Sequence, residues 1–282
     1  DNIVNNTLVK PEAVHAYDDA DTYMVVAADK GTATFSDEAN SIAHERHYWL
    51  GDAFASGGKH GYDHKKLGVT ARGAWQSLYW HLQCLGISYK EKFSMIAIGD
   101  MSGDVFGNGL LVTANSALIA AFDHRHIFID PSPKLKAAYA ERMRLFKLPT
   151  SSWDDYDRSK LSEGGGIYPR DTKYINISEQ ASSILGLDKL RIDPDSLIAA
   201  ILSAKVDVLF NGGIGTYVKS ESESNADVGD ANNDDCRINA TQLQAKAVVE
   251  GGNLGLTTKA RVEYALAGGL INQDAVDNAG GV

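Results

Sequence analysis

The sequence predicts an α/β protein with a doubly wound, mostly parallel sheet. Short apolar runs that are typical of buried strands occur at 93–98, 126–130, 206–211 and 246–250. Between these runs lie stretches with apolar residues at helical spacing. Parallel neighbours need a crossover connection, which is usually a helix. The alternation therefore indicates at least four strands of one sheet, connected by helices.

The N-terminal third of the chain contains one expected strand and one long helix. The strand is Tyr23–Asp29, and a stretch rich in Gly and His follows it. Residues 69–86 have apolar side chains at helical spacing and end at Gly86, a natural helix stop. We expect a domain boundary inside this helix, near residues 75–85.

The remaining elements follow the alternating pattern after strand 93–98. In chain order they are helix 107–122, strand 126–130, helix 134–146, helix 194–204, strand 206–211 and a last strand that starts at Lys246. Two polar stretches, 149–173 and 219–236, interrupt the pattern. Because both are rich in turn-forming residues and poor in large apolar ones, we predict that they are surface loops.

The charge of the chain excludes two classes of partner. Lys and Arg number 27 against 37 Asp and Glu, which gives a formal net charge of −10 over 282 residues. Nucleic acid and anionic membrane surfaces would repel such a chain. No apolar run approaches the ~18 residues that a membrane span needs. The chain starts without Met or a signal peptide, so we expect it to be a piece of a longer protein.

The cysteines and histidines do not form metal-binding patterns. Cys84 and Cys236 lie far apart and form no CxxC pair, so neither a disulfide framework nor a zinc site is expected. This cysteine usage fits a reducing cytoplasm. His44 and His47 lie one helical turn apart, but the HExxH order is missing. We therefore predict no metal site.

Three glycines, Gly99, Gly103 and Gly107, follow the first strand of the alternating region. A dinucleotide pyrophosphate needs backbone N–H groups without an obstructing side chain, which a glycine turn before a helix provides. The spacing G-x-x-x-G-x-x-x-G differs from the usual G-x-G-x-x-G. This turn, with Asp100 and Asp104, is a candidate cofactor site. The alternative is that the glycines only permit close packing of helix on sheet.

Polar residues also follow two other predicted strands. Asp130 ends the expected second strand, where a carboxylate can accept both ribose hydroxyls of NAD and would repel the 2′-phosphate of NADP. Its alternative role is a turn residue before Pro131. Asn211, Gly212 and Gly213 follow a later strand, at the end where open α/β sheets bind ligands. The alternative there is a tight Asn-Gly turn.

Several separated stretches together resemble one family, the glutamate dehydrogenases, and in particular the very large NAD-specific bacterial type. AADKGTATFSD resembles the family's catalytic loop, with Asp29 as its aspartate. GVTARGAW resembles the start of the interdomain helix and places Thr70 among the cofactor-binding candidates. VDVLFNGGIG is similar to the strand that ends beside the cofactor. EGGNLGLTT and DNAGGV are similar to family stretches that here contain Asn253 and Asn278.

The resemblance implies a Rossmann-like fold in three parts. Residues 1–75 would be a partial substrate-domain segment with the catalytic loop, residues 76–258 the dinucleotide-binding domain, and residues 259–282 the return towards the substrate domain. The chain departs from the family pattern in four ways. Gly252 stands where alanine is more frequent, the glycine turn is longer, the polar stretches 149–173 and 219–236 look like insertions, and no stretch matches the lysine-bearing substrate segment upstream of the catalytic loop.

The implied function is NAD-dependent oxidative deamination of L-glutamate to 2-oxoglutarate and ammonia. Each proton step of that reaction needs a positioned acid or base, and Asp29 is the implied group. Asn253 and Asn278 would approach the ribose and nicotinamide of NAD, although each could be only a cap or turn residue. We expect the full-length protein to be a homo-oligomer, and this piece to be inactive alone. Two alternatives stay open: another amino-acid dehydrogenase of the same superfamily, and a non-catalytic nucleotide-sensing module.

Overall fold

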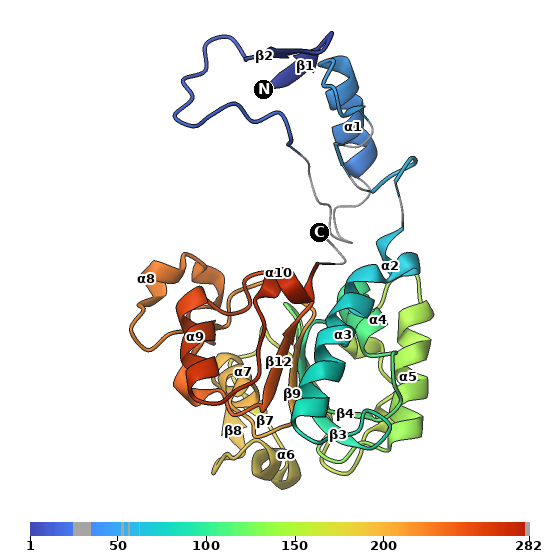
Figure 1. Cartoon of the computed structure of the whole chain (residues 1–282). Coiled ribbons are helices and arrows are strands. Elements are labelled where there is room, and N and C mark those ends of the chain that lie inside the picture. The colour runs from blue at the N-terminus through green and yellow to red at the C-terminus, as the bar shows by residue number, and fades with distance from the viewer. Residues whose placement is uncertain (25–34, 52–53, 56, 62, 280–282) are drawn as a thin grey trace. The chain divides into compact units, whose positions relative to one another are not determined.

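The computed structural model describes residues 1–24, 35–51, 54–55, 57–61 and 63–279 (Figure 1). The chain divides into two units, Asp1–Leu67 and Gly68–Val282. This division is one of packing, so the functional division proposed at residues 75 and 258 stays a prediction.

The first unit contains a short hairpin and two helices. They are β1 (Asn2–Val4), β2 (Thr7–Val9), α1 (Ser36–Glu45) and α2 (His64–Leu67). β1 and β2 pair antiparallel. Among the described residues of this unit, the buried apolar ones are Ala43 and Ala55. The predicted strand Tyr23–Asp29, and with it Asp29, falls mostly outside the described residues.

The second unit is built on a six-stranded sheet with the order β12-β9-β3-β4-β5-β6. The strands are β3 (Phe93–Ile98), β4 (Ser116–Phe122), β5 (His126–Ile129), β6 (Gly166–Pro169), β9 (Val208–Asn211) and β12 (Ala247–Glu250). β12, β9, β3 and β4 run parallel, whereas β5 is antiparallel to both of its neighbours. The predicted α/β fold with a mostly parallel sheet is confirmed.

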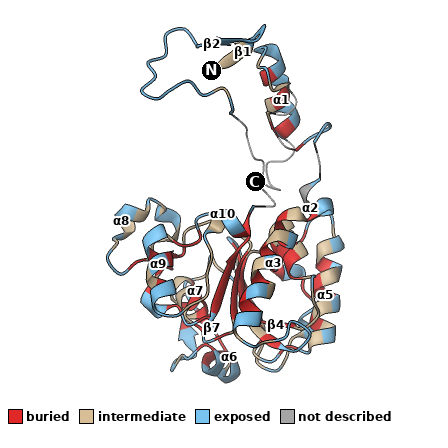
Figure 2. Ribbon diagram, in the orientation of Figure 1, coloured by how far each residue is buried: buried red, intermediate tan, exposed pale blue. Residues whose placement is uncertain are grey.

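Helices cover both faces of this sheet (Figures 1 and 2). Side chains alternate along β3, so Met95 and Ala97 join one apolar cluster, and Ile96 and Ile98 join the other. The first cluster includes residues of α3 (Val69–Cys84), α4 (Asp104–Gly109) and α5 (Leu135–Lys147). The second includes residues of α6 (Glu179–Ile184), α7 (Pro194–Leu202) and α9 (Thr258–Leu266). Each face of the sheet therefore has its own helical layer.

Short elements complete the second unit. They are β7 (Ile175–Asn176), β8 (Arg191–Ile192), β10 (Val218–Lys219), β11 (Ile238–Asn239), α8 (Asn225–Val228), α10 (Asp274–Asp277) and the 3₁₀ turns Trp153–Asp155, Arg158–Lys160, Ala231–Asn233 and Ala240–Gln242. The predicted helices at 69–86, 134–146 and 194–204 are confirmed within a few residues, as are strands 93–98, 206–211 and the one from Lys246.

The predicted helix at 107–122 is wrong. α4 ends at Gly109, and residues 116–122 form strand β4. All seven residues of β4 are buried, so the strand shows no alternation of polar and apolar residues. A short run buried on both faces cannot be distinguished from a buried helix by its periodicity. A side chain at Gly109 would clash with Phe210, since its Cβ would lie 2.4 Å from Cζ.

The polar stretch 149–173 is not simply a surface loop. It contains β6, which pairs with β5 at the edge of the sheet. Trp153 is fully buried, stacks on Phe128 with ring centroids 4.5 Å apart, and donates its indole N–H to the Gly99 carbonyl at 3.0 Å. One large aromatic residue therefore anchors a stretch whose composition is polar.

Candidate functional site

Four parallel strands end at one edge of the sheet, which we call the carboxyl edge. It consists of residues 98–103, 122–123, 211–213 and 250–253. Backbone hydrogen bonds continue past the strands here, from Gly99 to Phe122 (2.7 Å), from Gly212 to Ile98 (2.9 Å) and from Gly251 to Asn211 (2.8 Å). From β3 the chain continues outward to β4, β5 and β6 and then returns to β9 on the other side. The switch point between β3 and β9 is where open α/β sheets bind ligands.

The structure separates the roles of the three glycines in the turn after β3. Gly99 has φ +128°, and a Cβ there would lie 2.7 Å from Phe106 Cδ2. A Cβ at Gly107 would lie 2.5 Å from Phe146 Cδ2 and 2.8 Å from the Met101 carbonyl oxygen. At Gly103 the nearest atom would be the Asp100 carbonyl oxygen at 3.4 Å. Packing therefore explains Gly99 and Gly107 but does not explain Gly103.

Asp100 organises this turn. Its Oδ1 accepts hydrogen bonds from the backbone N–H groups of Ser102 (2.7 Å) and Gly103 (3.1 Å). Its Oδ2 lies 3.9 Å from the guanidinium of Arg125. Asp104 begins α4 and accepts a hydrogen bond from the Asn108 amide at 2.8 Å. Both carboxylates of the predicted site thus support the fold of the turn itself.

Asp123, which follows β4, is a candidate site residue that sequence reasoning missed. Its Oδ1 accepts from the backbone N–H groups of Arg125 (2.8 Å) and His126 (2.6 Å). Its Oδ2 is buried and has no hydrogen-bond partner among the described residues. Burial raises the pKa of Asp123, the two N–H donors oppose that rise, and the neighbouring Asp100 carboxyl adds to it. The signal was present, because Asp123 lies 24 residues after Gly99, near the usual spacing of about 20.

Asp130 does not end the second parallel strand, so the premise of its predicted role is wrong. The second strand is β4, and the antiparallel β5 carries the chain back from the carboxyl edge, so that the Asp130 N–H donates to Ile119 at 2.8 Å. Asp130 is fully buried, and its Oδ1 accepts hydrogen bonds from Ser162 N (3.0 Å) and Oγ. Burial raises its pKa, while Ser162 and Arg142 oppose the rise.

The turn after β9 packs closely on the first strand. A Cβ at Gly212 would lie 2.8 Å from Phe106 Cα, and one at Gly213 would lie 3.2 Å from Ile98 Cγ2. Asn211 is 1% exposed, and its Oδ1 accepts from the Gly213 N–H at 3.2 Å. These contacts support the turn role that the sequence left open, without excluding a ligand at the same edge.

A polar network, buried at Glu250 and Asp277 and exposed at Asn253, joins Asn253 to Asn278. The Asn278 amide donates to Asn253 Oδ1 at 2.8 Å. The Leu254 and Glu250 N–H groups donate to Asp274 (2.9 Å) and Asp277 (3.0 Å) of α10. In addition, the Arg261 guanidinium from α9 donates to the fully buried Glu250 carboxylate. The network holds α10, and therefore Asn278, at the end of β12.

Thr70 and Asp29 complete the set of predicted site residues. Thr70 is buried in the first turn of α3. This turn adjoins α4, since a Cβ at Gly68 would lie 2.9 Å from Asn108 Cγ. Asp29 lies outside the described residues. The structure therefore brings all the predicted residues of β3, β9, β12 and α10 to one edge and moves Asp130 away from it.

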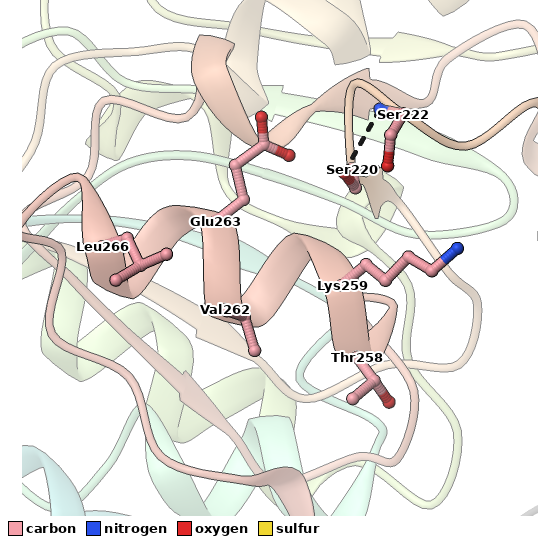
Figure 3. Close-up of a pocket in the computed structure, with 7 residues that line it drawn as sticks. All are labelled: Ser220, Ser222, Thr258, Lys259, Val262, Glu263 and Leu266. Atoms are coloured by element: carbon pink, nitrogen blue, oxygen red, sulfur yellow. Dashed lines mark hydrogen bonds between the residues drawn. The ribbon is translucent and has the colours of Figure 1, made fainter.

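Two surface pockets are lined by other residues of the chain. One, of about 390 Å³, lies beside α9 (Figure 3) and is lined by Ser220, Ser222, Thr258, Lys259, Val262, Glu263 and Leu266. The other, of about 370 Å³, lies within the first unit and includes Arg46, Tyr48 and Phe54. Neither contains a predicted site residue. In the described part of the chain, no group of three or more His, Cys, Asp or Glu residues could hold a metal ion, and no helix could cross a membrane.

The sequence matches a family model described as "Bacterial NAD-glutamate dehydrogenase, catalytic domain" over residues 1–282. It is 58% identical over 279 residues to an NAD-specific glutamate dehydrogenase of Mycobacterium tuberculosis, covering 96% of this chain and 17% of the relative. It is 55% identical over 283 residues to the protein of that name in Pseudomonas aeruginosa, and the match covers 100% of this chain and 18% of the relative. The chain thus spans less than a fifth of these relatives.

Solved structures share the fold at low identity. A glutamate dehydrogenase structure has a TM-score of 0.53 at 13% identity, covering 90% of this chain and 48% of the other. The structure of Plasmodium falciparum glutamate dehydrogenase 2 has a TM-score of 0.50 at 14% identity, and the match covers 91% of this chain and 47% of the other. These similarities support a Rossmann-like dehydrogenase fold.

Proposed function

The chain belongs to the family of bacterial NAD-glutamate dehydrogenase catalytic domains, and from this premise we propose that it holds the NAD-binding part of an enzyme that oxidises L-glutamate. The proposed reaction converts glutamate, water and NAD⁺ to 2-oxoglutarate, ammonia as ammonium ion, reduced NAD and one proton. The match over residues 1–282 and identities of 54–58% to relatives named NAD-specific glutamate dehydrogenase support this proposal.

The cofactor part of the proposal depends on one observation, the buried and unpartnered Oδ2 of Asp123 at the switch point. A buried polar atom without a partner is costly, and such atoms in native proteins require an explanation. Ribose hydroxyls are donors that fit this acceptor, and an acidic residue after the second strand is the expected ribose ligand. Asp123 therefore replaces Asp130 in this role.

The rest of the carboxyl edge fits the other parts of a dinucleotide. A Cβ at Gly103 would meet only ordinary contacts, with the nearest atom at 3.4 Å, so packing leaves room for a pyrophosphate to approach the turn between Gly99 and Asp104. With the adenosine ribose at β4, the other half of the cofactor would extend over the ends of β9 and β12. We assign Asn253 and Asn278 to that half because the structure joins them there.

The residues Asn211, Gly212 and Gly213 would form the floor between the two halves, and Thr70 would contribute from the start of α3. When bound, NAD supplies the acceptor for the hydride from the substrate Cα. We assign to Asp29 the proton transfers that accompany attack of water and loss of ammonia. A homo-oligomeric full-length protein and a cytoplasmic location stay predictions.

Initial rates of the full-length protein test this function. Glutamate and leucine should be compared as substrates, each with NAD and with NADP. The proposal expects oxidation of glutamate with NAD at the highest kcat/KM. A higher kcat/KM for leucine would favour another amino-acid dehydrogenase, and absence of turnover with bound NAD would favour a nucleotide-sensing module.

A further inference from the structure

Two carboxyl groups lie side by side at the carboxyl edge. Asp100 follows β3 and Asp123 follows β4, and the Gly99–Phe122 hydrogen bond holds the two strand ends together at 2.7 Å. Both residues are buried, with 8% and 7% of their surface exposed. Arg125 links the two groups, because its backbone N–H donates to Asp123 Oδ1 at 2.8 Å and its guanidinium lies 3.9 Å from Asp100 Oδ2. Two acidic groups therefore meet where water has little access.

The oxygens of the two groups have different surroundings. Asp100 has two backbone N–H donors on Oδ1 and the Arg125 guanidinium 3.9 Å from Oδ2. Asp123 has two backbone N–H donors on Oδ1, but its buried Oδ2 has no donor among the described residues. Asp123 Oδ2 is thus a buried oxygen without a donor or a cation among the described residues, and a second buried carboxylate follows the neighbouring strand.

A single proton would remove both the repulsion between the two carboxylates and the lack of a hydrogen-bond partner at Asp123 Oδ2. Two ionised carboxylates in contact repel each other, and low exposure to water strengthens that repulsion. A proton on Asp123 Oδ2 removes one charge and creates an O–H group that can donate to Asp100. The Arg125 guanidinium lies 3.9 Å from Asp100 Oδ2, so the cation of this cluster is beside Asp100. Carboxyl pairs that share a proton in this way titrate as a unit.

We propose that Asp123 carries a proton shared with Asp100 when no cofactor is bound, and that NAD binding releases this proton. The proposal rests on the proposed function, because it assigns the ribose hydroxyls to Asp123. Those hydroxyls donate hydrogen bonds, so the bound state needs the carboxylate as acceptor. The O–H bond of Asp123 breaks, the electron pair stays on Oδ2, and the proton passes to the buffer.

Groups from four parts of the fold face Asp123, and they do not remove the need for this proton. The charged and titratable ones are Asp100, Arg125, Arg170 and Tyr217, whereas His126 contributes its backbone N–H. Arg170 donates to the Asp123 backbone carbonyl at 2.9 Å and not to its carboxyl. Burial raises the pKa of Tyr217 to about 12, so its phenol is neutral near pH 7. Burial also raises the pKa of Asp123, in agreement with the geometry.

Calorimetric titration of the full chain with NAD tests the coupling. The same titration in two buffers of different ionisation enthalpy counts the protons released, and we expect one for each NAD bound well below the apparent pKa of the pair. In that range the Kd should rise about tenfold for each unit by which the pH falls. The proposal would be overturned if NAD bound without any release of protons at every pH at which binding is measured.

Asp100→Asn separates the shared proton from the turn. Asparagine keeps the acceptor for Ser102 and Gly103 and offers an N–H donor to Asp123, so NAD should bind without proton release. Asp130→Asn is the matched control, because Asp130 is another buried carboxyl but lies away from the edge. It should leave proton release unchanged. Retained proton release in Asp100→Asn would contradict the shared proton.

Infrared spectroscopy of the ligand-free chain tests the proton without the cofactor. A protonated carboxyl has a C=O stretching band that a carboxylate lacks, and this band should disappear in both Asp100→Asn and Asp123→Asn near pH 7. A spectrum that neither variant changes would overturn the inference. If NAD fails to bind at every pH, the proposed function and the coupling are both refuted, while the band still decides whether the proton is shared.

Discussion

Replacement of Gly103 by alanine distinguishes a turn that binds phosphate from a turn that only packs. Gly103 has φ −64° and ψ 145°, which every L-residue adopts, and its new Cβ would have no neighbour closer than 3.4 Å. The folded state therefore accepts the methyl group without strain. Loss of backbone freedom in the unfolded chain should then raise the free energy of unfolding by about 0.4–1 kcal/mol.

The same methyl group should weaken NAD binding. It projects into space that a pyrophosphate would need in order to approach the turn, so at least one hydrogen bond to a charged phosphate oxygen is lost. Such a bond contributes about 1.5–3 kcal/mol, which corresponds to a Kd about 10 to 150 times higher. Calorimetric titration with NAD measures this change, and urea unfolding measures the stability of the same variant.

Gly107→Ala is the matched control for this experiment. Its Cβ would lie 2.8 Å from a backbone oxygen and 2.5 Å from Phe146, so overpacking should lower the free energy of unfolding by about 1–3 kcal/mol. The two variants should thus separate binding from stability. An unchanged Kd in a folded Gly103→Ala variant would refute the reasoning and leave Gly103 without a ligand role.

Three further predictions concern buried charges. Asp123→Ala should narrow the preference for NAD over NADP, because a like-charge contact with the 2′-phosphate costs several kcal/mol; an unchanged ratio of the two Kd values would exclude Asp123 from the ribose site. Burial raises the pKa of the Asp130 carboxyl above its value in the unfolded chain, so the folded state binds the carboxyl proton more tightly than the unfolded state does. The free energy of unfolding should therefore fall as the pH rises from about 4 towards the pKa of Asp130 in the folded state. Asp130→Asn, which keeps an acceptor for Ser162, should lose this fall in urea unfolding at a series of pH values; an identical pH profile would count against a buried titrating carboxyl. Arg261→Met should lower the free energy of unfolding by about 3–5 kcal/mol at neutral pH, because the buried Glu250 carboxylate loses its cation; unfolding at the parental urea concentration would show that this ion pair is dispensable.

The sequence predicted those parts of the fold that local pattern determines. Strands 93–98 and 208–211 are isolated apolar runs with turn residues after them, so their type and ends could be read directly. The type of the run 116–122 could not be read from the sequence, because burial on both faces removes the alternation that marks a strand. That single error displaced the second strand and assigned to Asp130 the place that Asp123 occupies.

Contacts between distant segments set the limits of the site prediction. Asn253 and Asn278 were assigned to one cofactor site only through resemblance to a family, and their hydrogen bond was not predicted, since nothing in either local pattern brings the two together. The neighbouring carboxyls of Asp100 and Asp123 depend on the parallel pairing of β3 with β4. The spacing of Asp123 from Gly99 could have indicated a ligand role for Asp123, but it does not show that Asp123 and Asp100 are neighbours, which follows from the tertiary fold.

The burial of Trp153 limits where natural or engineered sequences can gain or lose residues. A polar stretch such as 149–173 is the kind of segment in which deletions are normally tolerated. Here, however, the indole holds the carbonyl of Gly99, 54 residues earlier in the chain, and fills space beneath the turn after β3. A shortened segment that displaces Trp153 would leave a hole under this turn. Length variation is therefore confined to the exposed positions on either side of Trp153 and β6.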